Sequence, residues 1–149
     1  MEKKRPFIDF AGRMISGDVP PPPVGRTIGF RLVEIAPDKA AFEMEADMDR
    51  HANPMGTLHG GILCDLSDGA IGMAWASELE EGESFTTLEL KINFLKPVWK
   101  GKLRAEARVL KRGKTVGLAE CTVRDGNGDL VAYVTSTLMT LRGDQAKGR

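Results

Sequence analysis

The chain has 149 residues, of which 42% are hydrophobic and 28% are charged, and its formal net charge is +0. This length is sufficient for one domain with its own core, and the composition is ordinary for a globular protein. The balanced charge argues against a nucleic-acid or acidic-membrane partner, and no apolar run approaches the ~20 residues of a membrane span.

The first 25 residues form a segment that precedes the main domain. Residues 5–16 are compatible with a short helix that has Phe7, Phe10, Ala11 and Met14 on one face. The stretch GDVPPPPVG (17–25) ends this helix, because consecutive prolines lack N–H donors and hold an extended path. The basic N-terminus is not followed by the apolar stretch of a signal peptide.

The two cysteines, Cys64 and Cys121, lie in apolar patterns without a spaced motif. They are interpreted as small core residues in a reducing compartment. We therefore expect a cytoplasmic protein.

Two strand-like runs, 28–35 and 39–46, are joined by a turn at Pro37–Asp38, and a helical pattern follows from Gly60 to about Leu79. Four further strand-like runs follow, at 85–95, 102–111, 114–124 and 130–141. The run that begins at Thr87 alternates cleanly, which predicts that Leu88, Leu90, Ile92 and Phe94 share one face. The short connections predict a meander of antiparallel strands. A single helix then has to pack against the whole sheet.

The long helix carries two apolar stripes. The first contains Ile62, Leu63, Leu66, Ala70 and Met73, and the second contains Gly61, Cys64, Asp68, Ile71 and Trp75. A helix that is apolar on both sides is buried on both sides. This pattern predicts an α+β fold in which a curved antiparallel sheet of about six strands wraps a long central helix. One open sheet leaves the second stripe uncovered, so we expect Ile71 and Trp75 to form an apolar patch that a second copy of the chain covers.

Asp68 lies in the middle of the second stripe. A carboxylate in apolar surroundings is unfavourable unless it is paired or functional. Asp68 therefore acts in the chemistry of the protein, or it bonds a backbone group at a packed interface, or the stripe that carries it faces solvent. Asp65 is the alternative functional acid. Its charge favours a position near a helix N-terminus, and it is interpreted as structural or solvated.

The stretch HANPMGTLHGG (51–61) contains the only two histidines of the chain and opens the long helix at Gly60–Gly61. The first N–H groups of a helix are unpaired, and glycine allows a ligand to approach them, so they can hold a carbonyl oxygen as it becomes an oxyanion. An ordinary glycine-rich helix start is the alternative. His51 is interpreted as a loop residue.

The longer stretch HANPMGTLHGGILCDLSD (51–68) resembles the hotdog-fold acyl-CoA thioesterases of the phenylacetate-degradation and 4-hydroxybenzoyl-CoA type. Their pattern is an asparagine, His-Gly-Gly six residues later and an acid nine residues after the histidine; here these are Asn53, His59-Gly60-Gly61 and Asp68. TLELKINFLKP resembles the third strand of the family, with Thr87 at its start, and VLKRGKT (109–115) resembles the hairpin that touches the CoA nucleotide. The resemblance covers about residues 28–141.

The resemblance implies an enzyme that hydrolyses the thioester of an acyl- or aryl-CoA to free acid and CoA. Asp68 would act as general base or nucleophile, and the Gly60 N–H would polarise the carbonyl group. Asn53 would assist or place water, and His59 would orient the loop or meet the sulfur. Thr87 would position water or the carboxylate, although an ordinary strand residue is the alternative there.

The resemblance also implies a CoA site and an assembly. The residues expected to bind CoA are Gly61, Lys111, Arg112, Gly113, Lys114 and Thr115. A solvated hairpin tip is the alternative for this hairpin. No metal and no cofactor are expected, since the CoA thioester is the substrate. At least a homodimer is expected, and beyond it a homotetramer made of two dimers, with the Gly60 end of one subunit beside Asp68 of the other. The hotdog domain would span residues 26–142 and be followed by a polar tail at 143–149.

Two other functions compete with hydrolysis. A hotdog hydratase or dehydratase of 3-hydroxyacyl thioesters would use a histidine and an acid, but the Gly-Gly helix start and Asn53 favour hydrolysis. A non-catalytic acyl-CoA binding protein is disfavoured by the intact Asp68.

Overall fold

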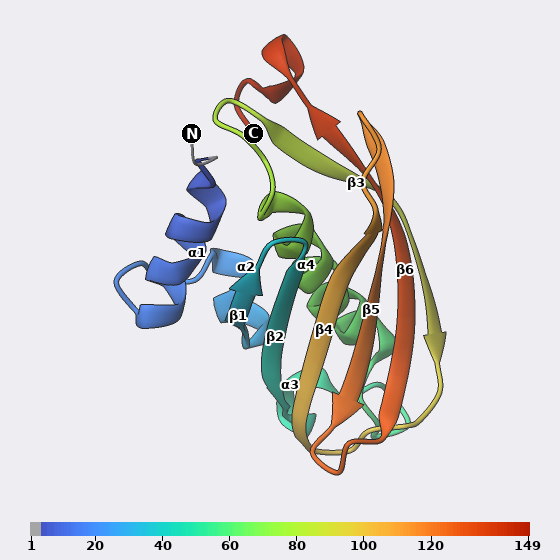
Figure 1. Cartoon of the computed structure of the whole chain (residues 1–149). Helices are drawn as coiled ribbons and strands as arrows, with labels where there is room; N and C mark the ends of the chain where they lie inside the picture. The colour runs from blue at the N-terminus through green and yellow to red at the C-terminus, as the bar shows by residue number, and fades with distance from the viewer. Residues whose placement is uncertain (1–3) are drawn as a thin grey trace.

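The computed structural model describes residues 4–149. Its centre is a curved antiparallel sheet that wraps around a long helix, α4 (Gly60–Ala76), and α4 contacts all six strands (Figure 1). The strands are β1 (Phe30–Ala36), β2 (Lys39–Ala46), β3 (Ser84–Phe94), β4 (Gly101–Lys111), β5 (Val116–Asp125) and β6 (Leu130–Leu141). The predicted α+β architecture, a long helix wrapped by about six antiparallel strands, is therefore confirmed.

The strand order is β1-β2-β4-β5-β6-β3. The meander prediction is right for β4, β5 and β6, but wrong for β3, which lies at the far edge and pairs with β6 instead of β4. The reason is that β4 has no free side, because β2 pairs with one of its edges and β5 with the other. The connection from β3 to β4 therefore runs across the end of the sheet, where the Val98 carbonyl accepts a hydrogen bond from the Leu58 N–H at 2.7 Å.

A bulge interrupts the alternation predicted for β3. The register with β6 shifts between Thr87 and Glu89, and the extra residue, Leu88, is 52% exposed. Leu90 and Ile92 still pack against the core. The prediction that Leu88 shares their face is wrong. One additional residue in a strand reverses the alternation of inward and outward side chains on either side of it.

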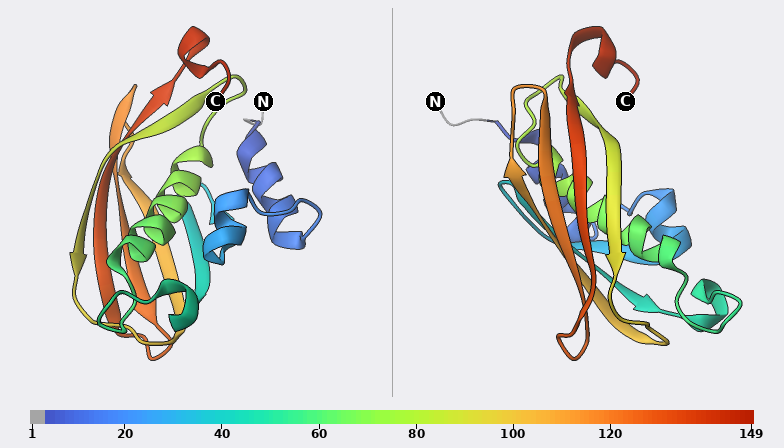
Figure 2. Two further views of the ribbon diagram at one scale, coloured as in Figure 1. Left: turned by 180° about the vertical axis from the view of Figure 1, so that it is seen from behind. Right: turned by 90° about the vertical axis from the view of Figure 1, so that its right-hand side faces the viewer.

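The second stripe of α4 is not one uniform surface. Ile71 and Trp75 are 0% exposed within the single chain, whereas Asp68 is exposed. The expected apolar patch of Ile71 and Trp75 is therefore wrong. The exposure changes along the helix. Thr140 of β6 and Arg112 of the turn between β4 and β5 contact its C-terminal part, whereas Asp65 and Asp68, which precede it on α4, are exposed. Figure 2 shows that the side of α4 that faces away from the sheet is not covered by another strand.

The N-terminal segment contains two helices, α1 (Pro6–Ser16) and α2 (Pro23–Ile28), which lie beside β1 on the open side of α4 (Figures 1 and 2). The helix α1 was predicted, with the difference that Phe10 is 46% exposed while Ala11 is buried. The helix α2 was not predicted. Its first residue is the last of four prolines, and proline fits the first helical turn because no N–H partner is needed there.

Two further short elements are α3 (Met48–His51), just before the glycine-rich loop, and η1 (Gly143–Ala146), in the C-terminal tail. Among residues 4–149, none of the helices combines the length and the apolar character needed to cross a bilayer.

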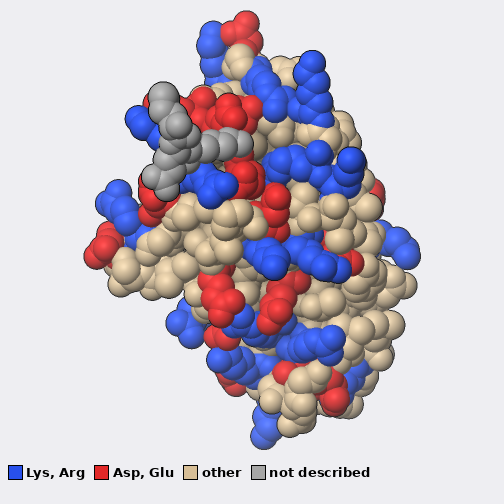
Figure 3. Space-filling view, viewed as in Figure 1, with Lys and Arg blue, Asp and Glu red and all other residues tan. Residues whose placement is uncertain are grey.

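The outer face of the sheet carries charges of both signs in close alternation (Figure 3). Glu43, for example, lies 3.0 Å from both Lys102 and Arg104. Burial raises the pKa of Glu43, but the two cations outweigh it and the net pKa lies below its usual value. This face therefore presents no large surface of a single sign.

Candidate active site

Asn53 organises the loop that leads into α4. Its Oδ1 accepts hydrogen bonds from the N–H groups of Met55 at 3.0 Å and Thr57 at 3.1 Å, and its Nδ2 donates to Thr57 Oγ1 at 2.8 Å. These bonds engage both ends of the amide within the loop. In the single chain, Asn53 therefore shapes the approach to Gly60 and does not meet Asp68.

The two histidines have different surroundings. His51 is 4% exposed; its Nδ1 accepts from the Asp47 N–H at 3.0 Å, and its Nε2 donates to the Ile28 carbonyl at 2.7 Å. This pattern is that of a neutral ring with a structural role. The interpretation of His51 as a loop residue is wrong, because it is the last residue of α3. His59 is exposed, and its N–H donates to the His51 carbonyl at 2.8 Å. The His59 ring lies against Gly61, where an added Cβ would be 3.1 Å from Nε2.

Gly60 is the first residue of α4, and its N–H has no acceptor among residues 4–149. The ring of Phe94 lies over it, so that a Cβ at Gly60 would be 2.8 Å from Phe94 Cζ. An unpaired N–H at the positive end of a helix dipole, beside an aromatic ring, is a suitable donor for a developing oxyanion.

Asp68 and Thr87 meet where α4 passes β3. Thr87 Oγ1 donates a hydrogen bond to Asp68 Oδ1 at 3.0 Å. The β3 bulge makes this contact possible, because it turns Thr87 toward the helix. No donor to Asp68 Oδ2 occurs within residues 4–149, so this oxygen is available to water or substrate.

A cavity of about 460 Å³ adjoins this pair. Its walls come from α4, β1, β2, β3 and the N-terminal segment, and they include Asp65, Asp68, Met73, Phe85 and Thr87. Trp75 does not line this cavity, because it lies in the core.

Asp65 shares this cavity, which the sequence did not indicate. Burial raises the pKa of Asp65, the charge of Asp68 raises it further, and His59 partly opposes the shift. Asp65 is exposed, which agrees with its interpretation as a solvated residue, and it also lines the cavity. The signal that could have revealed it is its position three residues before Asp68, on the same helix face.

The chain does not bring Gly60 and Asp68 together. They are eight positions apart on α4, which corresponds to about 12 Å along the helix axis. An oxyanion donor has to lie about 3 Å from the reacting oxygen, and a base has to be within hydrogen-bond reach of its proton. The two groups of one chain therefore cannot serve the same carbonyl group.

The hairpin expected to contact CoA lies at the C-terminal end of α4, the end opposite to Gly60. Lys111, Lys114 and Thr115 are exposed at its tip. Gly113 makes the tight turn, since an added Cβ would lie 2.2 Å from the Val116 carbonyl oxygen.

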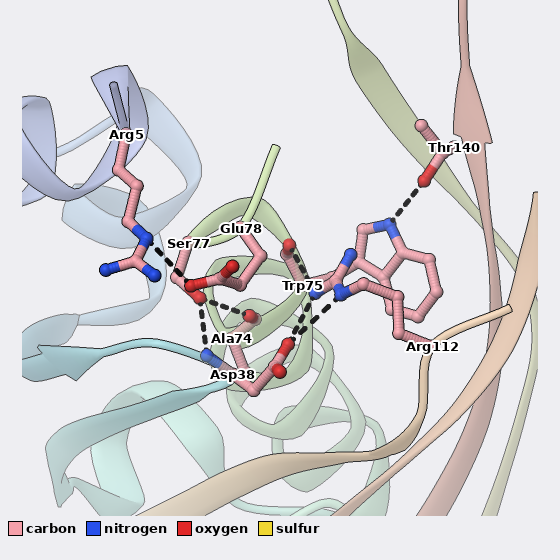
Figure 4. Close-up of polar contacts among 8 residues, drawn as sticks. All are labelled: Arg5, Asp38, Ala74, Trp75, Ser77, Glu78, Arg112 and Thr140. Atoms are coloured by element: carbon pink, nitrogen blue, oxygen red, sulfur yellow. Dashed lines mark hydrogen bonds and ion pairs between the residues drawn. The ribbon is translucent and has the colours of Figure 1, made fainter. Parts of the chain in front are cut away.

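Arg112 points inward from this hairpin (Figure 4). Its Nε and Nη2 donate to Asp38 Oδ1 at 3.1 and 2.8 Å, and Nη2 also donates to the Trp75 carbonyl at 2.9 Å. The guanidinium carbon lies 4.1 Å from the centre of the Trp75 ring. Arg112 is thus engaged within the fold, which the expectation of a phosphate contact did not foresee.

The residues of the site do not form a metal centre in the described part of the chain. Within residues 4–149, no three His, Cys, Asp or Glu side chains gather as metal ligands.

The fold and site have known counterparts. The profile of the thioesterase superfamily matches residues 55–132. Acyl-coenzyme A thioesterase 13 of Mus musculus is 33% identical over 103 residues, which are 68% of this chain and 72% of that protein. The crystal structure of a thioesterase family protein from Silicibacter pomeroyi is 31% identical, with a TM-score of 0.77, covering 89% of this chain and 99% of that one. The chain belongs to the thioesterase superfamily and has its hotdog fold.

Two relatives from Saccharolobus solfataricus are 39% and 37% identical over 87 residues, and this chain matches only part of their length. The alignments span 61% and 57% of their lengths.

Proposed function

We propose that this chain hydrolyses the thioester bond of an acyl- or aryl-CoA and releases the free acid and CoA. The observation that carries the proposal is the Asp68 carboxylate, held by Thr87 through one oxygen at the wall of a largely apolar cavity. The names of two relatives support it: the mouse protein is an acyl-CoA thioesterase, and a Listeria monocytogenes protein that is 29% identical over 112 residues is 1,4-dihydroxy-2-naphthoyl-CoA hydrolase.

In this proposal Asp68 is the general base. Its Oδ2 takes a proton from a water molecule while the water oxygen attacks the thioester carbon, and Thr87 keeps Oδ1 in place. The carbonyl oxygen gains negative charge, which the Gly60 N–H stabilises. The C–S bond then breaks, and the CoA thiolate leaves and is protonated. This chemistry needs side chains, backbone and water only, with the CoA ester as substrate and no cofactor.

We further propose that the site is shared between two chains. An antiparallel pair of α4 helices would bring Gly60 of one chain beside Asp68 of the other, twice, if the two-fold axis crosses the helix midway, near Cys64. The unpaired edge of β3 supports such a dimer, because Leu88, Phe94 and Leu95 are 52%, 56% and 55% exposed along it. An open, apolar strand edge favours pairing with another copy.

Two such dimers would form the proposed homotetramer. On the outer face of the sheet, Leu110, Val116 and Leu118 are 44%, 46% and 40% exposed. This apolar group lies beside charges of both signs, which is compatible with contact between identical surfaces.

The CoA nucleotide is proposed to lie near Lys111 and Lys114. Their exposure at the hairpin tip supports a role in contacting its phosphates, and Arg112 would hold the hairpin in place. A cytoplasmic location is proposed as well, since both cysteines are free thiols.

The function is tested by measuring free thiol release from a panel of acyl-CoAs. Release that depends on Asp68 supports hydrolysis. Loss of the double-bond absorbance of an enoyl-CoA without thiol release would indicate a hydratase instead, and tight acyl-CoA binding with neither signal would indicate a binding protein.

The shared site is tested by mixing two inactive variants, Asn53→Ala and Asp68→Asn, through unfolding and refolding. Random pairing makes about half of the dimers mixed, and each mixed dimer would hold one intact site, so activity should return to roughly a quarter of wild type. Absence of recovery in mixed dimers confirmed by mass would place both residues in one site of one chain.

The position of the two-fold axis is tested with a short bismaleimide. Linked dimers should form through Cys64, which is half-buried on α4, and should disappear in Cys64→Ser. Cys121 is 0% exposed and provides an internal control, because Cys121→Ser should leave the cross-link unchanged.

A further inference from the structure

The wall of the cavity that faces away from the sheet is built by the N-terminal segment. Met14 and Ile15 of α1, Pro21 and Pro22 of the following turn, and Val24 of α2 all line it. This segment lies outside residues 55–132, which match the superfamily profile. Residues outside that profile thus complete the cavity that contains Asp68.

This wall is fixed at both ends. At the start of α1, Arg5 Nε lies 2.9 Å from Glu78 Oε1, just beyond the C-terminus of α4 (Figure 4). In the middle, Ala11 is 0% exposed. At the other end, Arg26 Nη1 donates to the Pro21 carbonyl at 2.6 Å, and His51 holds the Ile28 carbonyl. Proline backbones add stiffness, so the wall is organised before a ligand arrives.

The interior of the cavity is apolar and partly aromatic. Phe30, Leu32, Phe42, Met73 and Phe85 line it from the strands and α4. Gly72 widens it, because a Cβ there would lie 3.1 Å from the Phe85 ring. Such walls bind apolar groups by burial, and the Asp68–Thr87 pair provides polar atoms at one place.

The wall also leaves apolar surface without cover. Ile15 is 41% and Val24 is 51% exposed, although both line the cavity. An apolar ligand in the cavity would remove this surface from water, which favours binding by about 25 cal/mol per Å².

We propose that the cavity is the acyl subsite, with the thioester carbonyl at Asp68 and the acyl tail against Met14, Ile15 and Val24, so that residues 6–24 set the length of acyl group accepted. This inference rests on the proposed hydrolysis of acyl-CoA. The cavity volume of about 460 Å³ exceeds the roughly 150 Å³ that encloses one benzene molecule. The substrates are therefore CoA esters of bulky apolar acids, either medium-chain or arylacyl, and acetyl-CoA is a poor substrate.

The experiment compares kcat/KM for acetyl-, butanoyl-, octanoyl-, dodecanoyl- and phenylacetyl-CoA in wild type and in variants of the full chain. Ile15→Trp fills the cavity and should lower the octanoyl-to-butanoyl ratio by about tenfold or more, since a methylene in a tight pocket is worth 10-fold or more in specificity. Ile15→Ala should move the optimum toward dodecanoyl-CoA. The kcat/KM values for octanoyl-CoA and phenylacetyl-CoA show whether the cavity prefers an extended chain or an aromatic ring.

Phe10→Ala is the matched control. Phe10 is also an apolar residue of α1, with a similar exposure of 46%, but it does not line the cavity. It should leave the chain-length profile unchanged. Equal profiles in Ile15→Trp and Phe10→Ala would overturn the proposal. If Ile15→Trp does not fold, Val24→Trp tests the same wall from α2.

A binding measurement separates this inference from the proposed function. S-octyl-CoA is a thioether that cannot be hydrolysed, and its affinity can be measured by calorimetry whether or not the chain is an esterase. Ile15→Trp should weaken its binding at least tenfold, and Phe10→Ala should not. If no thioester is hydrolysed but this difference is found, hydrolysis fails and the subsite stands; if the two variants bind it equally, the subsite fails.

Discussion

The two ends of α4 differ in burial and in hydrogen bonding. At the C-terminal end, Trp75 is 0% exposed, its Nε1 donates to Thr140 Oγ1 at 3.2 Å, and Arg112 covers its ring and carbonyl (Figure 4). Ser77 links the same end to the β1–β2 turn, because it donates to the Ala74 carbonyl and accepts from the Asp38 N–H. At the N-terminal end, Gly60 has no side chain, and its N–H has no acceptor in the described part of the chain.

This difference separates stability from reactivity along one helix. At the closed end, hydrogen bonds of Trp75, Ser77 and Arg112 fix the helix against the neighbouring strands and turns. The open end keeps donors and carboxylates without full partners, which stabilises the fold less but leaves groups that a substrate can use. Substitutions at the two ends should therefore affect different measurements.

The largest effect is expected at the open half, for Asp68→Asn. The amide keeps the volume but cannot take a proton, so kcat should fall by about 10²–10⁴-fold while the unfolding temperature stays nearly constant. The measurements are kcat for the best acyl-CoA and thermal unfolding of the same sample. Asp65→Asn is the matched control on the same helix face. If kcat decreases by less than about tenfold in Asp68→Asn but decreases strongly in Asp65→Asn, then Asp65 and not Asp68 is the general base.

Trp75→Ala should have the converse effect at the closed end. Removal of a fully buried tryptophan should lower the free energy of unfolding by about 3–5 kcal/mol, with kcat of the folded protein changed little. Denaturant unfolding measures this. Trp99, which is 57% exposed, is the control, and Trp99→Ala should remain within about 0.5 kcal/mol of wild type. Equal losses in the two variants would mean that the closed end does not anchor the helix.

Smaller and different effects are expected for substitutions of Arg112 and of Lys114 in the same hairpin. Arg112→Ala removes the contacts with Asp38 and the Trp75 ring, and it should lower the free energy of unfolding by about 1–2 kcal/mol. Lys114→Ala should leave stability unchanged but raise KM by roughly two- to fivefold and flatten its dependence on salt, because an exposed phosphate contact is screened. Unchanged KM and salt dependence in Lys114→Ala would remove the hairpin from the CoA site.

The smallest expected effect concerns pH and Asp65. Burial and the charge of Asp68 raise the pKa of Asp65 above its usual value. A carboxyl group with a raised folded-state pKa favours folding fully only below its unfolded pKa, and this contribution is lost as pH rises through the folded pKa. Asp65→Asn should therefore be only slightly more stable than wild type at pH 7, because Asp65 is exposed and solvent screens its charge. The difference should shrink as the pH of the unfolding experiment is lowered through the folded-state pKa, and it should vanish below the unfolded pKa of about 4. A difference independent of pH would assign it to another cause.

The sequence allowed prediction of what depends on local pattern. The six strands, the helix from Gly60 and the motif of Asn53, His59 and Asp68 follow from periodicity, turn residues and the resemblance. The placement of Gly60 and Asp68 on one helix is confirmed, whereas their roles in a site stay predictions.

The features that escaped prediction depend on contacts between distant segments. The position of β3 beside β6 follows from both edges of β4 being occupied, which no local pattern reports. The bulge at Leu88, which aims Thr87 at Asp68, is invisible in an alternating stretch. The inward turn of Arg112 depends on Trp75, 37 positions earlier, and the cavity wall at Ile15 depends on how α1 packs.

The place of Trp75 in the core has a consequence for how this family can vary. Gly117 lies under it in β5, where a Cβ would be 2.7 Å from the Trp75 ring and 2.2 Å from the Lys111 carbonyl oxygen. The register shift between Val109 and Lys111 brings that carbonyl close. The tryptophan, the glycine and the bulge therefore depend on one another sterically. In a homologue with a small residue in place of Trp75, a side chain at position 117 would still collide with the Lys111 carbonyl oxygen as long as the bulge is present. We therefore expect the three changes to occur together among homologues and seldom singly.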